Sequence, residues 1–164
     1  MIHHISLEAN NPKHVATVLA EIIGGQAIIA PPNFPLGSQF VLSGDQHGTM
    51  FEVMPRGTDL RPDESEVGFH QAATPRSTYS GAHAYISVNA TCEKITAIGA
   101  REGWLTRRCN RGPFELMECW VENQLMLELA PPPMLDQYLN FLTNPEMMQA
   151  ALAGLLVTEA ALSQ

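Results

Sequence analysis

Cationic residues are scarce in this chain. It has nine Lys and Arg residues against seventeen Asp and Glu residues among 164 positions, which gives a formal net charge of −8. The basic residues are scattered and form no cluster. A surface of this charge repels the phosphate backbone of nucleic acids and the anionic surface of a membrane. We therefore expect neither a nucleic-acid partner nor a peripheral membrane role.

Long apolar runs and paired cysteines are also missing. No stretch reaches the roughly 18 to 20 apolar residues that cross a membrane. Residues 1–11 lack the basic segment, followed by an apolar one, that opens a secretory signal. The three cysteines, Cys92, Cys109 and Cys119, are odd in number and lack CxxC spacing. This pattern favours reduced thiols in the cytoplasm over a disulfide framework or a zinc–thiolate site.

An internal repeat is the strongest signal in the sequence. The segment HISLEA, which begins at His4, resembles HAYISV, which begins at His83, and MFEVMP around Glu52 matches MLELAP around Glu128. The separation from His4 to Glu52 is nearly the same as that from His83 to Glu128. Two unrelated strand pairs have little reason to keep such offsets, so the pattern indicates a duplicated unit.

Each copy predicts one strand, one helix and three further strands. Asn11-Pro12 is typical of a helix start and Gly24-Gly25 of a helix end, and Thr91 and Gly103 bound a second helix in the same way. The three later strands are expected at 27–30, 39–43 and 49–54 in the first copy, and at 105–109, 114–121 and 124–129 in the second. The fold class is therefore α+β, with two βαβββ modules.

The repeat divides the chain into four parts. We expect a first module over residues 1–56, a linker or lid over 57–81, a second module over 82–131 and a helical extension over 132–164. In the extension, Met134–Leu142 and Pro145–Leu162 are expected to form two helices outside the repeat, which favours an intramolecular core or a dimer seam there. We expect a homodimer.

Side-chain alternation along the strands places four polar residues on one kind of face. His4 and His83 fall opposite the apolar residues of the first strands, and Glu52 and Glu128 fall opposite those of the fourth strands. An unpaired carboxylate buried there would be costly. A divalent ion bound by His4, Glu52, His83 and Glu128 removes that cost, and such a set suits Zn, Ni, Fe, Co or Mn. The alternative is that each glutamate pairs with Arg107 or Arg108.

These motifs resemble the vicinal oxygen chelate superfamily, which includes glyoxalase I, methylmalonyl-CoA epimerase, fosfomycin-resistance enzymes, extradiol dioxygenases and bleomycin-resistance proteins. The resemblance spans about residues 2–131. It implies paired modules that curl as a mixed sheet around a cleft, with metal ligands on the first and fourth strands of each module. His4, Glu52, His83 and Glu128 match those places. The full set is more similar to glyoxalase I than to the dioxygenases, although no glutathione-binding pattern and no fosfomycin-type cation loop is present.

The resemblance and the residue set together suggest a metal-dependent, glyoxalase-like lyase or isomerase that acts on a small oxygenated substrate. The ion would act as a Lewis acid, and Glu128 or Glu52 would be the general base. Tyr85 and Ser6 are candidate substrate contacts. Two alternatives stay open: an extradiol-type dioxygenase with iron on His4, His83 and Glu128, or a non-catalytic small-molecule binding protein of the same fold.

Overall fold

The computed structural model describes residues 2–62, 67–72, 79, 81–147, 149–150 and 153. The first module runs β1 (His4–Ala9), α1 (Pro12–Ile23), β2 (Gln26–Ile29), β3 (Gln39–Leu42) and β4 (Met50–Pro55). Its sheet has the order β1-β4-β3-β2, in which β1 is parallel to β4 and the other neighbours are antiparallel.

The second module repeats this arrangement. It runs β7 (Ala84–Ser87), α2 (Cys92–Glu102), β8 (Thr106–Asn110), β9 (Glu115–Val121) and β10 (Leu125–Ala130). The sheet order β7-β10-β9-β8, with β7 parallel to β10, is that of the first module. The predicted pair of βαβββ modules is confirmed, with strand ends that differ from the expected ones by a residue or two.

Capping residues fix the two helices where the sequence placed their ends. The side chain of Asn11 accepts a hydrogen bond from the His14 amide over 3.2 Å, and Thr91 does the same for the Lys94 amide. Gly24 and Gly103 end the helices in the left-handed conformation, with φ of 74° and 68°. Such a backbone is inexpensive only for glycine, which is why the chain turns into the next strand at these points.

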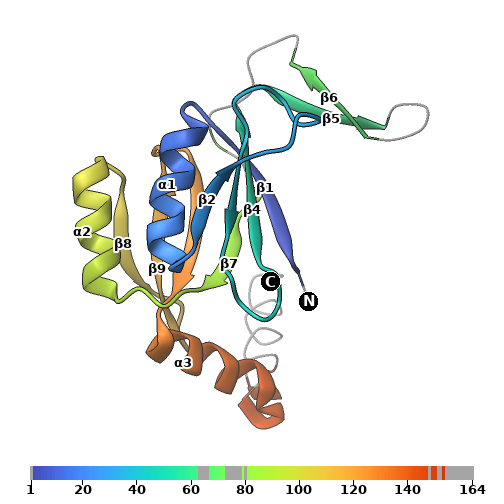
Figure 1. The fold of residues 1–164 in the computed structure, drawn as a ribbon. Coiled ribbons are helices and arrows are strands. Elements are labelled where there is room, and N and C mark those ends of the chain that lie inside the picture. The colour runs from blue at the N-terminus through green and yellow to red at the C-terminus, as the bar shows by residue number, and fades with distance from the viewer. Residues whose placement is uncertain are drawn as a thin grey trace, which may run out of the picture.

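The helices α1 and α2 lie side by side and join the modules (Figure 1). Arg101 on α2 donates a hydrogen bond to Glu21 on α1 over 2.8 Å. The turn of the second module also reaches α1, where the Glu122 carboxylate accepts hydrogen bonds from the amides of Asn10 and Asn11. Apolar residues from both modules form one core. The strands β1 and β7, in contrast, are edge strands of two separate sheets.

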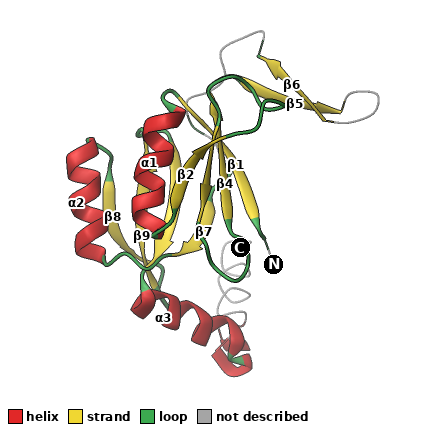
Figure 2. Ribbon diagram, viewed as in Figure 1, coloured by secondary structure: helices red, strands yellow, loops and turns green. Residues whose placement is uncertain are grey.

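Two elements lie outside the repeat. The segment 57–81, expected as a linker or lid, carries a hairpin of β5 (Thr58–Pro62) and β6 (Val67–Gln71), which projects from one end of the first sheet (Figure 2). The first C-terminal helix is present as α3 (Pro132–Thr143). Most of the second expected helix, 145–162, falls outside the described residues. In the described part of the chain, no helix is both apolar enough and long enough to span a membrane.

Candidate functional site

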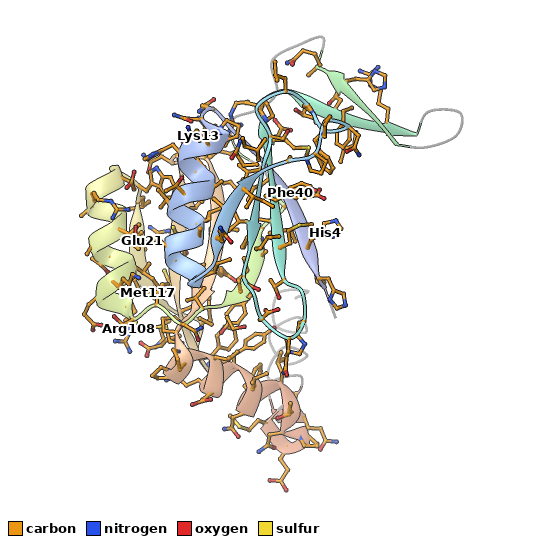
Figure 3. The ribbon with its side chains drawn as sticks, in the orientation of Figure 1. His4, Lys13, Glu21, Phe40, Arg108 and Met117 are labelled. Atoms are coloured by element: carbon orange, nitrogen blue, oxygen red, sulfur yellow. The ribbon has the colours of Figure 1, made fainter. Side chains whose placement is uncertain are left out.

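The candidate ligands lie on the strand faces that the alternation predicted. Glu52 is half-buried between Phe51 and Val53, whose side chains are 2% and 0% exposed on the other face. Figure 3 shows His4 on the side of the first sheet that faces away from α1. The helices cover one face of each sheet, and the candidate residues occupy the other.

Strand register gives the two histidine–glutamate pairs the same geometry. In the parallel pair β1–β4, Ser6 lies directly opposite Glu52, and in β7–β10, Tyr85 lies directly opposite Glu128. His4 precedes Ser6 by two positions, and His83 precedes Tyr85 by two. Each histidine therefore projects beside its glutamate from the same relative position. The duplicated spacing in the sequence reflects a duplicated register in the sheets.

In the first pair, Glu52 divides its carboxylate between two neighbours. Its Oε2 accepts a hydrogen bond from the Ser6 hydroxyl over 2.5 Å, and its Oε1 lies 3.9 Å from Nε2 of His4. The second distance is too long for a hydrogen bond. The Glu52 side chain is 14% exposed and the imidazole 54% exposed. The Ser6 hydroxyl thus fixes Oε2 of Glu52, while Oε1 faces the exposed imidazole of His4.

The second pair has the same form with a different donor. Oε2 of Glu128 lies 3.9 Å from Nε2 of His83, and a terminal guanidinium nitrogen of Arg111 donates to Oε1 over 2.9 Å. Where Glu52 has the neutral Ser6 hydroxyl, Glu128 therefore has a full positive charge. The two pairs share a geometry but differ in electrostatics.

Each pair supplies the right donor types for half of a divalent metal site. Two nitrogen or oxygen ligands bound at about 2.1 Å to one ion are roughly 3.0 to 3.5 Å apart, so a separation of 3.9 Å requires only a small side-chain rotation. Among the described residues, however, no group of three or more His, Cys, Asp or Glu side chains is close enough to hold a metal ion. A single chain brings the four residues together as two pairs on two sheets, and not as one set of four.

The alternative prediction, that Glu52 and Glu128 pair with Arg107 or Arg108, is wrong because both arginines bind other glutamates. Arg107 donates to Glu118 over 2.6 Å, and Arg108 pairs with Glu115. The cation beside Glu128 is Arg111, and no Lys or Arg ion pair is seen for Glu52 in the described part of the chain.

Glu118 holds the arginines of the second sheet in place. It is 4% exposed and lies directly opposite Glu128 in the β9–β10 register. Its Oε1 accepts from Arg111 over 2.9 Å, and its Oε2 accepts from Arg107 and, over 3.2 Å, from the Trp120 indole. Burial alone raises the pKa of a carboxyl group, but these hydrogen bonds outweigh it and lower the pKa of Glu118 to about 2. Glu118 is therefore an anion at ordinary pH, and it anchors Arg111 beside Glu128.

Tyr85, a candidate substrate contact, packs against α3. Its ring stacks on that of Tyr138 with centroids 4.1 Å apart, and Phe114 contacts both rings edge-on. Burial, together with the neighbouring Tyr138 and Glu128, raises the pKa of Tyr85 to about 12. Its hydroxyl is buried and has no hydrogen-bond partner within the described residues. Tyr85 is therefore neutral at ordinary pH, and its hydroxyl can donate a hydrogen bond.

Sequence reasoning missed three residues of these faces: Arg111, Glu118 and Phe40. Arg111 follows β8, and its link to Glu128 depends on a tertiary contact. Glu118 lies in the run ELMECWV, where a charged residue at a buried position was the available signal. Phe40 lies directly opposite Glu52 in the β3–β4 register, which only the strand pairing reveals.

Solved structures share this fold. A mutant of the fosfomycin resistance protein FosX from Listeria monocytogenes, in complex with Mn(II) and 1S,2S-dihydroxypropylphosphonic acid, is 16% identical with a TM-score of 0.54, over 85% of this chain and 97% of that chain. FosX from Mesorhizobium loti is 13% identical with a TM-score of 0.51, over 84% and 96%. Lactoylglutathione lyase from Agrobacterium tumefaciens is 10% identical with a TM-score of 0.52, over 81% and 94%.

The chain therefore has the fold of the vicinal oxygen chelate superfamily, as the sequence motifs predicted. At these identities the similarity shows the architecture alone. No known family model matches the sequence, and neither does any curated protein.

Proposed function

We propose that this protein is a metal-dependent, glyoxalase-like enzyme, a lyase or isomerase, that acts on a small oxygenated substrate. The observation that carries the proposal is the repeated pair geometry: the Nε2 to Oε distance is 3.9 Å both for His4 and Glu52 and for His83 and Glu128. Mn(II) in a FosX structure of the same fold supports a divalent ion in such a framework.

We further propose that two copies of the chain complete each site. One chain holds the pairs on separate sheets, and each pair lies next to an edge strand, β1 or β7. Edge strands present backbone groups that can pair with a second chain. A twofold axis would set the His4–Glu52 pair of one copy against the His83–Glu128 pair of the other, at two equivalent sites.

Within such a site, the residues of this chain have distinct tasks. His4 and His83 supply imidazole nitrogens, and Glu52 and Glu128 supply the carboxylate oxygens that face them. A bound divalent ion would act as a Lewis acid toward two adjacent substrate oxygens. Glu52 has the neutral Ser6 hydroxyl as its partner, whereas Glu128 is hydrogen-bonded to the charged Arg111. Glu128 or Glu52 would be the general base for a proton on the carbon next to those oxygens.

Complementation between chains tests this proposal. The double variants His4→Ala/Glu52→Gln and His83→Ala/Glu128→Gln should each lose stoichiometric Mn(II) binding. Mixing and refolding the two variants should restore binding, because a mixed dimer contains one intact site. Failure of the mixture to bind, when the wild-type protein binds, would show that sites are not shared between copies. Absence of stoichiometric binding by the wild-type protein would reject the metal-dependent function.

One observation favours a second candidate, a non-catalytic binding protein. Arg111 already neutralises Glu128, so this carboxylate is tolerated at its half-buried position without a metal ion. Ligand binding that is unchanged by chelator, together with no turnover of hemithioacetal, epimerisable thioester or catechol substrates, would favour this candidate.

A further inference from the structure

The two sheets carry opposite chemistry at matching positions, and this difference points to a substrate preference. In the second sheet, the row beside Glu128 continues across the strands to Glu118 and Arg107. In the first sheet, the row beside Glu52 continues to Phe40 and Ile28. Charged residues that satisfy one another fill one row, and apolar side chains form the other.

Phe40 is the nearest apolar neighbour that the strand register gives to Glu52. The two residues are direct partners across the antiparallel strands β3 and β4, so their side chains stand next to each other on the same face. Figure 3 shows Phe40 on the same side of the sheet as His4. Ile28, the next residue in the row, is 37% exposed, so the apolar surface continues outward from Phe40.

Two further aromatic rings extend this surface. Phe34, in the loop before β3, meets Phe40 edge-on with centroids 4.9 Å apart. Phe69, on strand β6 of the inserted hairpin, meets Phe34 with centroids 5.0 Å apart. All three rings are half-buried. The hairpin, which has no counterpart in the second module, thus adds a ring to the apolar surface that begins beside Glu52.

We propose that Phe40, Phe34 and Phe69 form an aromatic subsite for an apolar substituent of the substrate, best an aryl group, attached next to the two oxygens that a metal ion would bind. This inference rests on the proposed function for the position of the oxygens. A ring seated against Phe40 would lose water-exposed apolar area and gain edge-to-face or offset-stacked contacts. The charged residues Glu118 and Arg107, which take the matching positions beside Glu128, offer no such surface.

Two neutral vicinal diols test the aromatic subsite, because they share the two oxygens and differ in the apolar substituent. With Mn(II) present, 1-phenylethane-1,2-diol should bind about tenfold more tightly than propane-1,2-diol, since the phenyl group buries more apolar area than a methyl group. Phe40→Ala and Phe69→Ala should reduce this ratio to near one, and Phe40→Leu should retain part of it. Dissociation constants from ligand-detected NMR give the ratio, which does not depend on the fraction of folded protein.

A matched control comes from α3. Phe141 is also half-buried and packs on one aromatic ring, that of Phe114, with centroids 6.1 Å apart. Phe141→Ala should leave the ratio of the two diols unchanged. Equal affinity of the wild-type protein for both diols would overturn the subsite, as would a phenyl preference that survives Phe40→Ala.

Benzyl alcohol, which has one oxygen, distinguishes this inference from the proposed function. It should bind with or without Mn(II), and Phe40→Ala should weaken its binding. If Mn(II) does not bind while benzyl alcohol binds in a Phe40-dependent way, the metal-dependent function fails and the subsite stands. If both diols bind equally and only with Mn(II), the subsite fails and the metal-dependent function stands.

Discussion

The Ser6 hydroxyl donates a 2.5 Å hydrogen bond to Oε2 of Glu52, from the position directly opposite on the neighbouring parallel strand. This contact holds one carboxylate oxygen and turns the other toward His4. A donor that orients a ligating carboxylate raises metal affinity without becoming a ligand itself. Ser6 is therefore a positioning residue for Glu52 in the proposed site.

We expect Ser6→Ala to lower the affinity for Mn(II) by about tenfold, a typical effect of losing an outer hydrogen bond to a metal ligand. Ser6 is exposed, and so is Ser87, the residue used as a control. The free energy of unfolding should therefore change by less than about 1 kcal/mol in either variant. Ser87→Ala on the edge strand β7 is the matched control, and its affinity should equal that of the wild-type protein. Calorimetric titration measures both. Equal losses in the two variants would argue against a positioning role for Ser6.

In the proposed site, Arg111 and a divalent ion would compete for Glu128. The guanidinium lies 2.9 Å from Oε1, and its charge repels a cation bound at the other oxygen. We expect Arg111→Gln to raise the affinity for Mn(II) by about tenfold, measured by competition with a fluorescent chelator. Arg108→Gln, which removes an arginine paired with Glu115, should have little effect. Weaker binding by Arg111→Gln would show instead that the guanidinium orients Glu128.

Glu118 makes the free energy of unfolding depend on pH in the acidic range. Its pKa in the folded protein is about 2, below an ordinary value of 4.5. Its stabilising contribution is therefore complete above the ordinary value and is lost as the pH falls through about 2. The shift corresponds to about 3 kcal/mol. The difference in unfolding free energy between wild type and Glu118→Gln should shrink between about pH 6 and about pH 2.5 in urea titrations.

The control for this pH dependence is Glu115→Gln. Glu115 also pairs with an arginine, Arg108, but its side chain is 26% exposed. Exposed ion pairs contribute about 0 to 1 kcal/mol, so this variant should follow the wild-type curve closely. A Glu118→Gln curve parallel to the wild-type curve over the whole range would show that Glu118 is not the group responsible.

Gly99 lies inside α2, where glycine lowers helix stability, because β8 approaches it closely. A Cβ at this position would overlap the side chain of Thr106, with Cγ2 and Oγ1 as the nearest atoms. We expect Gly99→Ala to destabilise the fold by about 1 to 3 kcal/mol, since this overlap outweighs a gain of about 1 kcal/mol in helix propensity. Urea midpoints measure the effect.

Thr106→Ala removes the two atoms that would lie closest to a Cβ on Gly99, Cγ2 and Oγ1, and leaves only its own Cβ at 3.0 Å. The double variant Gly99→Ala/Thr106→Ala should therefore be more stable than the sum of the single changes predicts, by at least about 1 kcal/mol. Additive effects would place the cost of Gly99→Ala in the helix itself rather than in its contact with β8.

Local sequence rules were sufficient for most of the secondary structure. The caps Asn11 and Thr91 and the glycines 24 and 103 placed both helices, since these residues act on the backbone next to them. The turn residues Glu122 and Asn123 adopt positive φ of 50° and 56° in the predicted hairpin. The hairpin β5–β6 was not predicted, because a polar, proline-containing stretch is not typical of two paired strands.

For the candidate site, too, the sequence predicted some residues and the tertiary structure was needed for others. Alternation and duplication identified His4, Glu52, His83 and Glu128 as residues of the faces opposite the helices, and the strand registers agree with that prediction. Arg111 could not be predicted from the sequence, because it lies after β8 and only the tertiary structure brings it to Glu128 on β10. The pairing of Glu52 with Ser6 required the sheet register, and that of Glu128 with Arg111 required the tertiary structure.

By itself, the sequence determined the two βαβββ units and the face on which each candidate ligand stands, because periodicity and capping are local properties of the chain. Only the tertiary structure decided which groups meet. It kept the His4–Glu52 and His83–Glu128 pairs on separate sheets, since the modules join through α1 and α2 rather than through β1 and β7. It also set Phe40 beside Glu52, because cross-strand neighbours are chosen by register and not by position in the chain. It brought Arg111, which follows β8, to Glu128 through a side-chain hydrogen bond.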